Sequence, residues 1–166
     1  MEMIMLRNVQ PTDLQQLLAI ENEGFSPKEA ATKEAFIERI KLIADTFIVA
    51  EKEGEILGYI NGPIIQQPYI TDDLFEEIKE NPKLGGWQSI LGLAVSKQAR
   101  NQGISKRLMK RIEELVKENK RLGVTLTCKE ELISFYEACG YANQGVAESI
   151  HGGVVWYNMV KTKEKC

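Results

Sequence analysis

Apolar side chains recur along this chain with two spacings. In some segments every second residue is apolar, as in β-strands, and in others every third or fourth residue is apolar, as in α-helices. Alternation on both sides of Glu53 and Gly54 predicts an antiparallel hairpin, and a second hairpin is predicted near the C-terminus. Single strands are predicted before the first hairpin and between the two hairpins. The predicted strand segments are residues 2–10, 46–63 for the first hairpin, 87–95, 123–128, and 141–150 with 154–161 for the last hairpin.

Four segments between these strands show the spacing of amphipathic helices. The predicted starts are Pro11, the cap residue Thr32, Gly103 or Ile104, and Lys129, with the second helix ending near Asp45 and the fourth closed by Gly140. The order is strand, helix, helix, two strands, insert, strand, helix, strand, helix and two strands. We therefore predict one α/β (α+β) domain over residues 1–166, with a mixed sheet covered by helices.

The composition argues against several classes of protein. The net charge is −3 with a single histidine, so the chain lacks the basic character with which nucleic-acid binders neutralise phosphate. The N-terminal residues lack a signal-peptide pattern, and no window has the roughly 18 apolar residues of a membrane span. Three cysteines without a CxxC motif fit neither a disulfide framework nor a zinc site. We expect a cytoplasmic protein without a metal, nucleic acid or membrane partner.

Residues 65–86 interrupt the strand pattern, and we predict that they form a substrate lid. Between residues 64 and 86 five acidic residues outnumber two lysines, and Tyr69, Phe75 and nearby Trp87 supply aromatic rings. A cationic amine would be attracted to such a segment. The alternative is a solvated acidic helix, from Thr71 to Glu80, with the aromatic residues packed in the core.

A glycine turn and a basic helix follow the strand at residues 87–95. The N-terminus of a helix has unpaired backbone N–H groups, and glycine lets a phosphate approach the backbone closely. Residues 100–121 carry eight Lys or Arg against three Glu, which attracts anions. The alternative is a capped helix with a solvated charged face. The sequence contains neither GxxxxGK[ST] nor GxGxxG, which argues against the usual nucleoside triphosphate and dinucleotide sites.

The turn itself has a recognisable pattern. Arg100-Asn101-Gln102-Gly103-Ile104-Ser105 matches R/Q-x-x-G-x-G/A at every position except the last. With the strand LGLAV before it and FYEACGY at residues 135–141 after it, the sequence resembles the GNAT superfamily of acetyl-CoA-dependent N-acetyltransferases over roughly the whole chain. The resemblance implies a splayed, mostly antiparallel sheet of about seven strands and acetyl-CoA as the acetyl donor.

The resemblance also implies the donor-binding residues. Pantetheine would pair with the backbone of the strand LGLAV, and the pyrophosphate would meet the amides of the following turn. The implied set is Leu93, Ala94, Val95, Arg100, Asn101, Gln102, Gly103, Ile104 and Ser105. Ser105 departs from the family's Gly or Ala, and we expect its hydroxyl to tighten the geometry without loss of binding.

Tyr136 occupies the position of the family's general acid, and the backbone N–H near Leu93 would polarise the thioester carbonyl. Without the resemblance, Tyr136 fits a core residue on an apolar helix face. The run LTCKEELISFYEACGY is most similar to the arylalkylamine N-acetyltransferase branch. Two histidines of its animal members fall at Ser89 and Leu91 here, so water, backbone or a carboxylate must take the proton of the amine.

Two other reactive side chains have simpler interpretations. We expect Cys128 to be packed and inert rather than an acyl carrier, because no histidine lies near it in sequence. His151 fits a hairpin turn, and as the only histidine it could alternatively face the amine pocket. The candidate acceptor-binding residues are Tyr69, Phe75, Trp87, Ser89 and His151.

Three functions remain in competition. The leading prediction is an enzyme that acetylates the primary amine of a small molecule, such as an arylalkylamine or a polyamine, by direct attack in a ternary complex. The second is a protein N-terminal or lysine acetyltransferase, which would need an open peptide groove where the insert lies. The third is a non-catalytic acyl-CoA-binding module. The sequence leaves a homodimer open.

Overall fold

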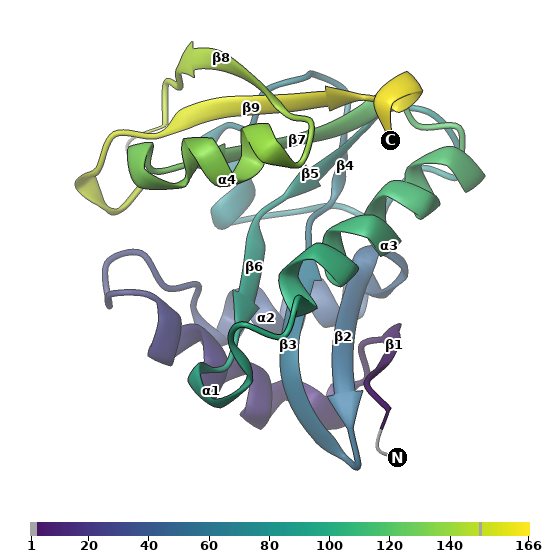
Figure 1. The fold of residues 1–166 in the computed structure, drawn as a ribbon, viewed down its shortest axis with the longest axis vertical. Helices are drawn as coiled ribbons and strands as arrows, with labels where there is room; N and C mark the ends of the chain where they lie inside the picture. The colour runs from purple at the N-terminus through teal and green to yellow at the C-terminus, as the bar shows by residue number, and fades with distance from the viewer. Residues whose placement is uncertain (1–2, 150) are drawn as a thin grey trace.

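A computed structural model describes residues 3–149 and 151–166, and in this part of the chain the strands form two sheets (Figure 1). The first sheet has the order β1-β2-β3-β6 and is antiparallel. The second has the order β4-β5-β7-β9-β8, in which only β5 and β7 are parallel. The bounds are β1 Met5–Asn8, β2 Phe47–Lys52, β3 Glu55–Asn61, β4 Ile64–Ile65, β5 Trp87–Ile90, β6 Gly92–Val95, β7 Gly123–Cys128, β8 Ala142–Val146 and β9 Tyr157–Thr162. The predicted mixed, mostly antiparallel strand arrangement is confirmed, but the described residues form nine strands in two sheets rather than about seven strands in one sheet.

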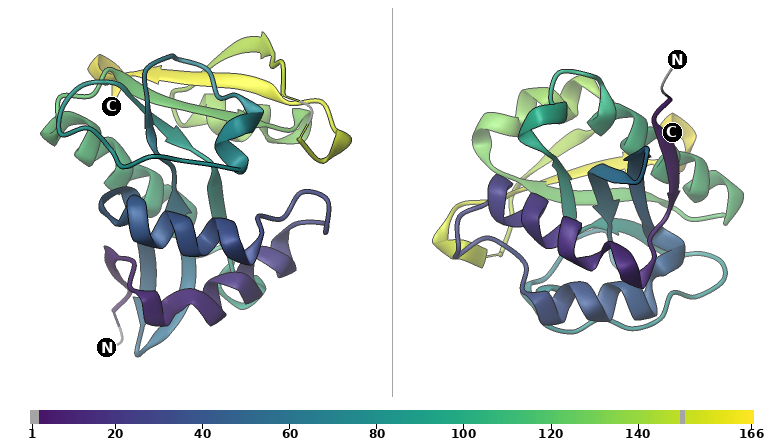
Figure 2. Two further views of the ribbon diagram at one scale, coloured as in Figure 1. Left: turned by 180° about the vertical axis from the view of Figure 1, so that it is seen from behind. Right: turned by 90° about the horizontal axis from the view of Figure 1, so that it is seen from below.

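Helices cover both sheets, and their bounds are α1 Leu14–Gly24, α2 Lys33–Leu42, α3 Ile104–Glu118 and α4 Ile133–Ala138. Figures 1 and 2 show α1 and α2 against one face of the first sheet, α3 against its opposite face, and α4 on the second sheet. The Thr32 side chain caps α2 by accepting a hydrogen bond from the Ala35 N–H at 3.1 Å. The apolar stripe of α3 is buried in one cluster with Ile48 of the first sheet and Val124 of the second. This helix therefore holds the two sheets together.

The strand predicted at residues 87–95 is divided between the two sheets at Leu91. The Leu91 N–H donates to the Asn61 carbonyl at 2.8 Å, while Gly92 is the ladder partner of Asn61. Two residues opposite one form a β-bulge, which bends the strand. Gly62, the residue that follows β3, has no room for a side chain, because a Cβ there would lie 1.9 Å from the Ser89 carbonyl oxygen. As a result β5 stays beside β7 while β6 departs with β3, which produces the predicted splay.

The insert differs from its predicted form. A single 3₁₀ turn, Asp72–Phe75, replaces the helix expected from Thr71 to Glu80. Ile70 and Ile78 are buried on either side of this turn, and the Ile78 N–H donates to the Glu38 carboxylate of α2 at 2.8 Å rather than to a helical carbonyl. The helical interpretation was wrong because these tertiary contacts outweigh the local acidic pattern. The short strand β4 at the start of the insert was not predicted.

Element boundaries shift by a few residues elsewhere. The second helix ends at Leu42 rather than near Asp45, because Ala44–Thr46 forms a separate 3₁₀ turn. β1 and β8 are shorter than the predicted segments 2–10 and 141–150, of which residues 2 and 150 lie outside the described part of the chain.

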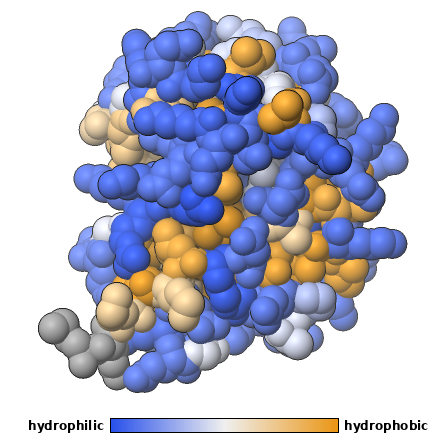
Figure 3. All heavy atoms as spheres, turned by 90° about the vertical axis from the view of Figure 1, so that its right-hand side faces the viewer, coloured by the Kyte–Doolittle hydropathy of each residue, from blue (hydrophilic) through white to orange (hydrophobic). Residues whose placement is uncertain are grey.

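The face shown in Figure 3 is mostly hydrophilic, and its apolar side chains form small patches separated by polar ones. Among the described residues, no helix combines the length and apolar character needed to cross a bilayer.

Candidate active site

β6 presents backbone groups to the opening between the sheets. The Ser96 N–H donates to the Leu57 carbonyl of β3 at 2.8 Å, which fixes the direction of the ladder bonds. Because these directions alternate along a strand, the N–H and C=O groups of Leu93 and Val95 point away from β3. β6 is the edge of its sheet, so these groups face the opening, where an extended amide chain could pair with them.

A groove of about 860 Å³ runs from β6 to the first turn of α3. Its lining includes eight of the nine residues predicted to bind the donor, namely Leu93, Ala94, Val95, Arg100, Asn101, Gly103, Ile104 and Ser105. Gln102 instead lines a neighbouring depression beside Gln98. The local motif thus predicted one continuous groove.

The turn before α3 leaves the N-terminus of the helix open toward the groove. Gly103 precedes the helix with a φ of 74°, a left-handed conformation that favours glycine, and Asn101 has a φ of 67°. No side chain among the described residues caps this helix, so its first N–H groups remain available to a ligand. Ser105 lies within this first turn and lines the groove.

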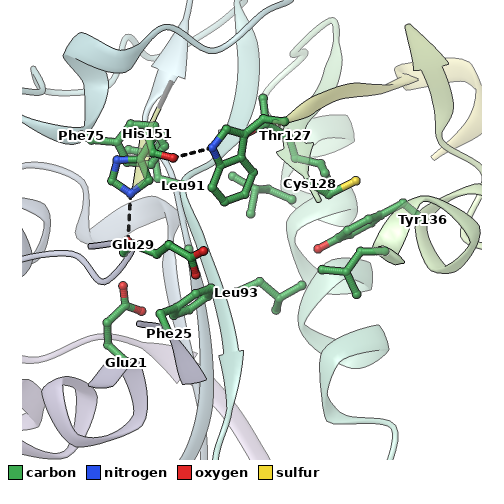
Figure 4. Close-up of a pocket in the computed structure, with 15 residues that line it drawn as sticks. Glu21, Phe25, Glu29, Phe75, Leu91, Leu93, Thr127, Cys128, Tyr136 and His151 are labelled. Carbon is green, nitrogen blue, oxygen red and sulfur yellow. Dashed lines mark hydrogen bonds between the residues drawn. The ribbon is translucent and has the colours of Figure 1, made fainter. Parts of the chain in front are cut away.

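A second, smaller pocket of about 100 Å³ lies toward the start of β6, beside Gly92 and Leu93 (Figure 4). Aromatic rings form its outer wall: Phe75 of the insert stacks on His151 with ring centroids 4.2 Å apart and an interplanar angle of 9°. The Trp156 Nε1 donates to the His151 carbonyl at 2.7 Å, and the His151 Nε2 lies 2.8 Å from the Glu29 carbonyl. Segments far apart in the sequence therefore meet around one small space.

Two carboxylates line this pocket. Glu21, in the last part of α1, is buried and accepts hydrogen bonds from the Tyr59 hydroxyl and from the Ala31 N–H at 2.6 Å. Burial raises the pKa of Tyr59, and the neighbouring carboxylate acts in the same direction, so the phenol remains a donor. Glu29 pairs with Lys129 through Oε1 and Nζ at 2.6 Å. Glu21 thus fixes the loop that follows α1, and Glu29 connects that loop to the end of β7.

The groove and the pocket meet at four residues that line both: Phe25, Leu93, Leu132 and Tyr136. Figure 4 shows the Tyr136 hydroxyl pointing into the pocket, opposite Glu21 and Phe25. Burial raises the pKa of Tyr136 above its usual value, and Cys128 and Cys139 act in the same direction. The phenol is therefore a proton donor across the neutral pH range.

Cys128 lies beside this junction and is 2% exposed. Burial raises the pKa of its thiol to about 11, and Glu131 adds to the shift. A neutral thiol is a poor nucleophile, which agrees with the prediction of inert packing.

The candidate acceptor residues separate into two groups. Phe75 and His151 line the pocket, whereas Tyr69, Trp87 and Ser89 are absent from its lining. Tyr69 is 42% exposed, and the buried Ser89 hydroxyl donates to the Pro63 carbonyl at 2.6 Å. Trp87 packs against Gly123 at the far end of β5. The interpretation of His151 as part of a turn is also correct, because His151–Gly153 is a 3₁₀ turn between β8 and β9.

Sequence reasoning missed Glu21, Phe25, Glu29 and Trp156, which all line the pocket. Trp156 falls in the predicted strand segment 154–161, and no role at the site was predicted for any of the four. The loop at residues 25–32 and the turn at 151–156 carry no motif of their own, and only the folded chain brings them together. In residues 3–149 and 151–166, no group of three or more His, Cys, Asp or Glu side chains is placed to hold a metal ion.

The site thus consists of a groove that ends at a helix N-terminus and a small pocket that meets it at Leu93 and Tyr136. The model of the acetyltransferase (GNAT) domain family matches residues 13–163, and the chain belongs to this family. No curated protein sequence matches the chain significantly.

Solved structures share this fold at low sequence identity. The GphF GNAT-like decarboxylase in complex with isobutyryl-CoA has a TM-score of 0.81 and 17% identity over 96% of this chain and 99% of that one. The loading GNATL domain of CurA from Lyngbya majuscula has a TM-score of 0.80 and 15% identity over 99% and 100%. Naa20 from Chaetomium thermophilum in complex with a bisubstrate analogue has a TM-score of 0.75 and 23% identity over 97% and 87%. These similarities confirm the GNAT fold.

Proposed function

We propose that this protein transfers the acetyl group of acetyl-CoA to the primary amine of a small molecule by direct attack in a ternary complex. The observation that carries the proposal is the junction of the groove and the pocket at Leu93 and Tyr136. A thioester at this junction would lie beside an edge-strand amide on one side and a phenol on the other. Donor and acceptor can therefore meet without an acyl-enzyme.

The donor half of the proposal rests on charge and backbone geometry. The pantetheine amides would pair with the outward backbone groups of Leu93 and Val95, and the pyrophosphate would bind the turn from Arg100 to Ser105. Beyond this turn a second groove of about 560 Å³ is lined by Glu113 and Glu114 of α3 and by three lysines of the same helix, Lys106, Lys110 and Lys117. These cations suit the phosphate-bearing nucleotide end of the coenzyme.

The chemistry follows from the same junction. The acceptor ammonium first loses a proton to water or a carboxylate, and the neutral amine then attacks the thioester carbonyl while the Leu93 N–H stabilises the oxyanion as a fixed dipole. The attacking nitrogen gives up its second proton in the same way before the intermediate collapses. When the tetrahedral intermediate collapses, the C–S bond breaks, the amide forms, and Tyr136 donates a proton toward the leaving sulfur. Burial that raises the pKa of the phenol also disfavours a bare thiolate, so the two acids shift in the same direction.

The acceptor half of the proposal rests on size and lining. About 100 Å³ bounded by Phe25, Phe75, His151 and Trp156 suits the amine end of a compact molecule with an aromatic or apolar group. This lining favours an arylalkylamine over a polyamine, in agreement with the predicted placement near the arylalkylamine N-acetyltransferases. The free cysteines suit the cytoplasm, where thiols stay reduced.

One experiment separates the three candidate functions. Acetyl-CoA turnover is measured, with product mass, against arylalkylamines, polyamines, and peptides with free N-termini or lysines. We expect acetylated arylalkylamine. Acetylation of peptides alone would favour the protein acetyltransferase, and tight acetyl-CoA binding without any transfer would favour the binding module.

A further inference from the structure

We propose that Glu29 binds the ammonium group of the acceptor, and that Lys129 forms an ion pair with the Glu29 carboxylate until the acceptor displaces it. The inference rests on the proposed function of the pocket as an amine-binding site. It assigns a specificity-determining residue and an internal competitor to that pocket.

Glu29 is held firmly in the pocket wall. Its backbone carbonyl lies 2.8 Å from the His151 Nε2, and its side chain packs against Gly152, where a Cβ would lie 2.8 Å from the Glu29 Cγ. The Glu29 side chain is only 9% exposed. The loop after α1 and the turn between β8 and β9 together fix this carboxylate at the pocket.

An enclosed carboxylate needs a cationic partner, because desolvation of an unpaired charge is costly. The other carboxylate of the pocket, Glu21, already accepts from Tyr59 and from the Ala31 N–H. Glu29 instead takes its partner from outside: Lys129 follows β7 and is absent from the pocket lining, yet its Nζ lies 2.6 Å from the Glu29 Oε1.

Lys129 has the properties of a replaceable partner. Its side chain is 32% exposed, and a lysine ammonium on a flexible stem regains its hydration readily when it swings into water. A primary ammonium from the acceptor would offer Glu29 the same charge and the same N–H donors. It would also bring its substituent against Phe75, His151 and Trp156, which Lys129 does not.

This exchange predicts opposite effects for the two members of one ion pair. Glu29→Gln should weaken binding of a cationic amine by roughly tenfold or more, because a charged hydrogen-bond acceptor is lost. Lys129→Met should tighten binding by about two- to fivefold, the scale of one partly exposed ion pair. A purely structural ion pair would make both variants bind the amine more weakly.

The test is titration of the full chain, saturated with CoA, with 2-phenylethylamine and with its uncharged analogue 2-phenylethanol. Wild type, Glu29→Gln, Lys129→Met and the double variant are compared by calorimetry, and thermal melting checks that each is folded. Lys28→Met and Glu130→Gln are matched controls, because each removes an exposed charge next to one member of the pair. We expect opposite shifts for the amine, no shifts for the alcohol, and no effect of Lys129→Met when Glu29 is already Gln.

Each result has a defined meaning. Weaker amine binding in Lys129→Met, equal shifts for amine and alcohol, or no amine binding to wild type would overturn the assignment. Acetyl transfer to other amines alongside such a result would leave the proposed function intact. Opposite shifts without any acetyl transfer would support Glu29 as the ammonium-binding residue while the proposed function fails.

Discussion

Replacing Tyr136 by phenylalanine deletes one hydroxyl at the junction of the two cavities and preserves the ring. The ring packs edge-on against Phe135 and Tyr141, with centroid distances of 5.1 and 5.9 Å, and the residue is 8% exposed. Phenylalanine keeps these contacts, so the free energy of unfolding should change by less than about 1.5 kcal/mol. General acid catalysis contributes 10²- to 10⁴-fold, or about 3–5 kcal/mol of barrier. The effect on rate should exceed the effect on stability.

The assay is a single-turnover measurement with saturating acetyl-CoA and an amine confirmed as acceptor, because slow product release could hide a loss in steady state. Acetyl-CoA affinity should stay nearly unchanged. Since the pKa of Tyr136 is raised, the phenol stays protonated as pH rises through neutrality. Deprotonation of Tyr136 should therefore not lower the wild-type rate between about pH 7 and 9. A folded Tyr136→Phe protein with the wild-type single-turnover rate would show that the tyrosine is only a core residue.

Three other substitutions test neighbouring parts of the site. Gly103→Val should weaken acetyl-CoA binding in calorimetry, because a β-branched residue is strained at a φ of 74°; unchanged affinity in a folded variant would remove this turn from the donor site. Cys128→Ala should still transfer acetyl groups, and alkylation of wild-type Cys128 by iodoacetamide should accelerate only as the pH approaches its pKa of about 11; an acetyl-Cys128 that acylates amine would contradict this. Glu21→Ala should cost about 1–3 kcal/mol of stability and raise the KM for amine, because two buried donors lose their acceptor, whereas the control Asn22→Ala should do neither; equal effects of the two variants would refute the role of Glu21.

Much of the fold was predictable because it depends on local patterns. The alternation around Glu53 and Gly54, the Thr32 cap and the apolar stripe of α3 each specify their element from neighbouring residues. The division of the strand at Leu91 was not predictable, because it depends on pairing with Asn61 in a distant strand. The insert was misinterpreted for the same reason, since buried contacts at Ile70 and Ile78 decide its path.

The groove and the pocket also differ in how far the sequence predicts them. The donor groove follows from a local motif around Gly103, where spacing and conformation can be inferred from the sequence. The acceptor pocket depends on contacts such as Glu29 with Lys129 and Phe75 with His151, which join residues far apart in the chain. The aromatic and acidic composition of the insert singled out Phe75, which lines the pocket, but the same reasoning could not separate it from Tyr69 and Trp87.

The division at Leu91 also has a consequence for how such a protein can diversify. One uninterrupted stretch, residues 93–105, supplies most of the groove proposed for the donor. The pocket proposed for the acceptor draws in addition on the end of α1 and its loop, the insert, the end of β7 and the turn before β9. The loop after α1, the insert and the turn before β9 are connections between elements, where changes in length and composition are well tolerated. Exchanging these connections can therefore give a lineage a new acceptor while the machinery for the coenzyme is inherited unaltered.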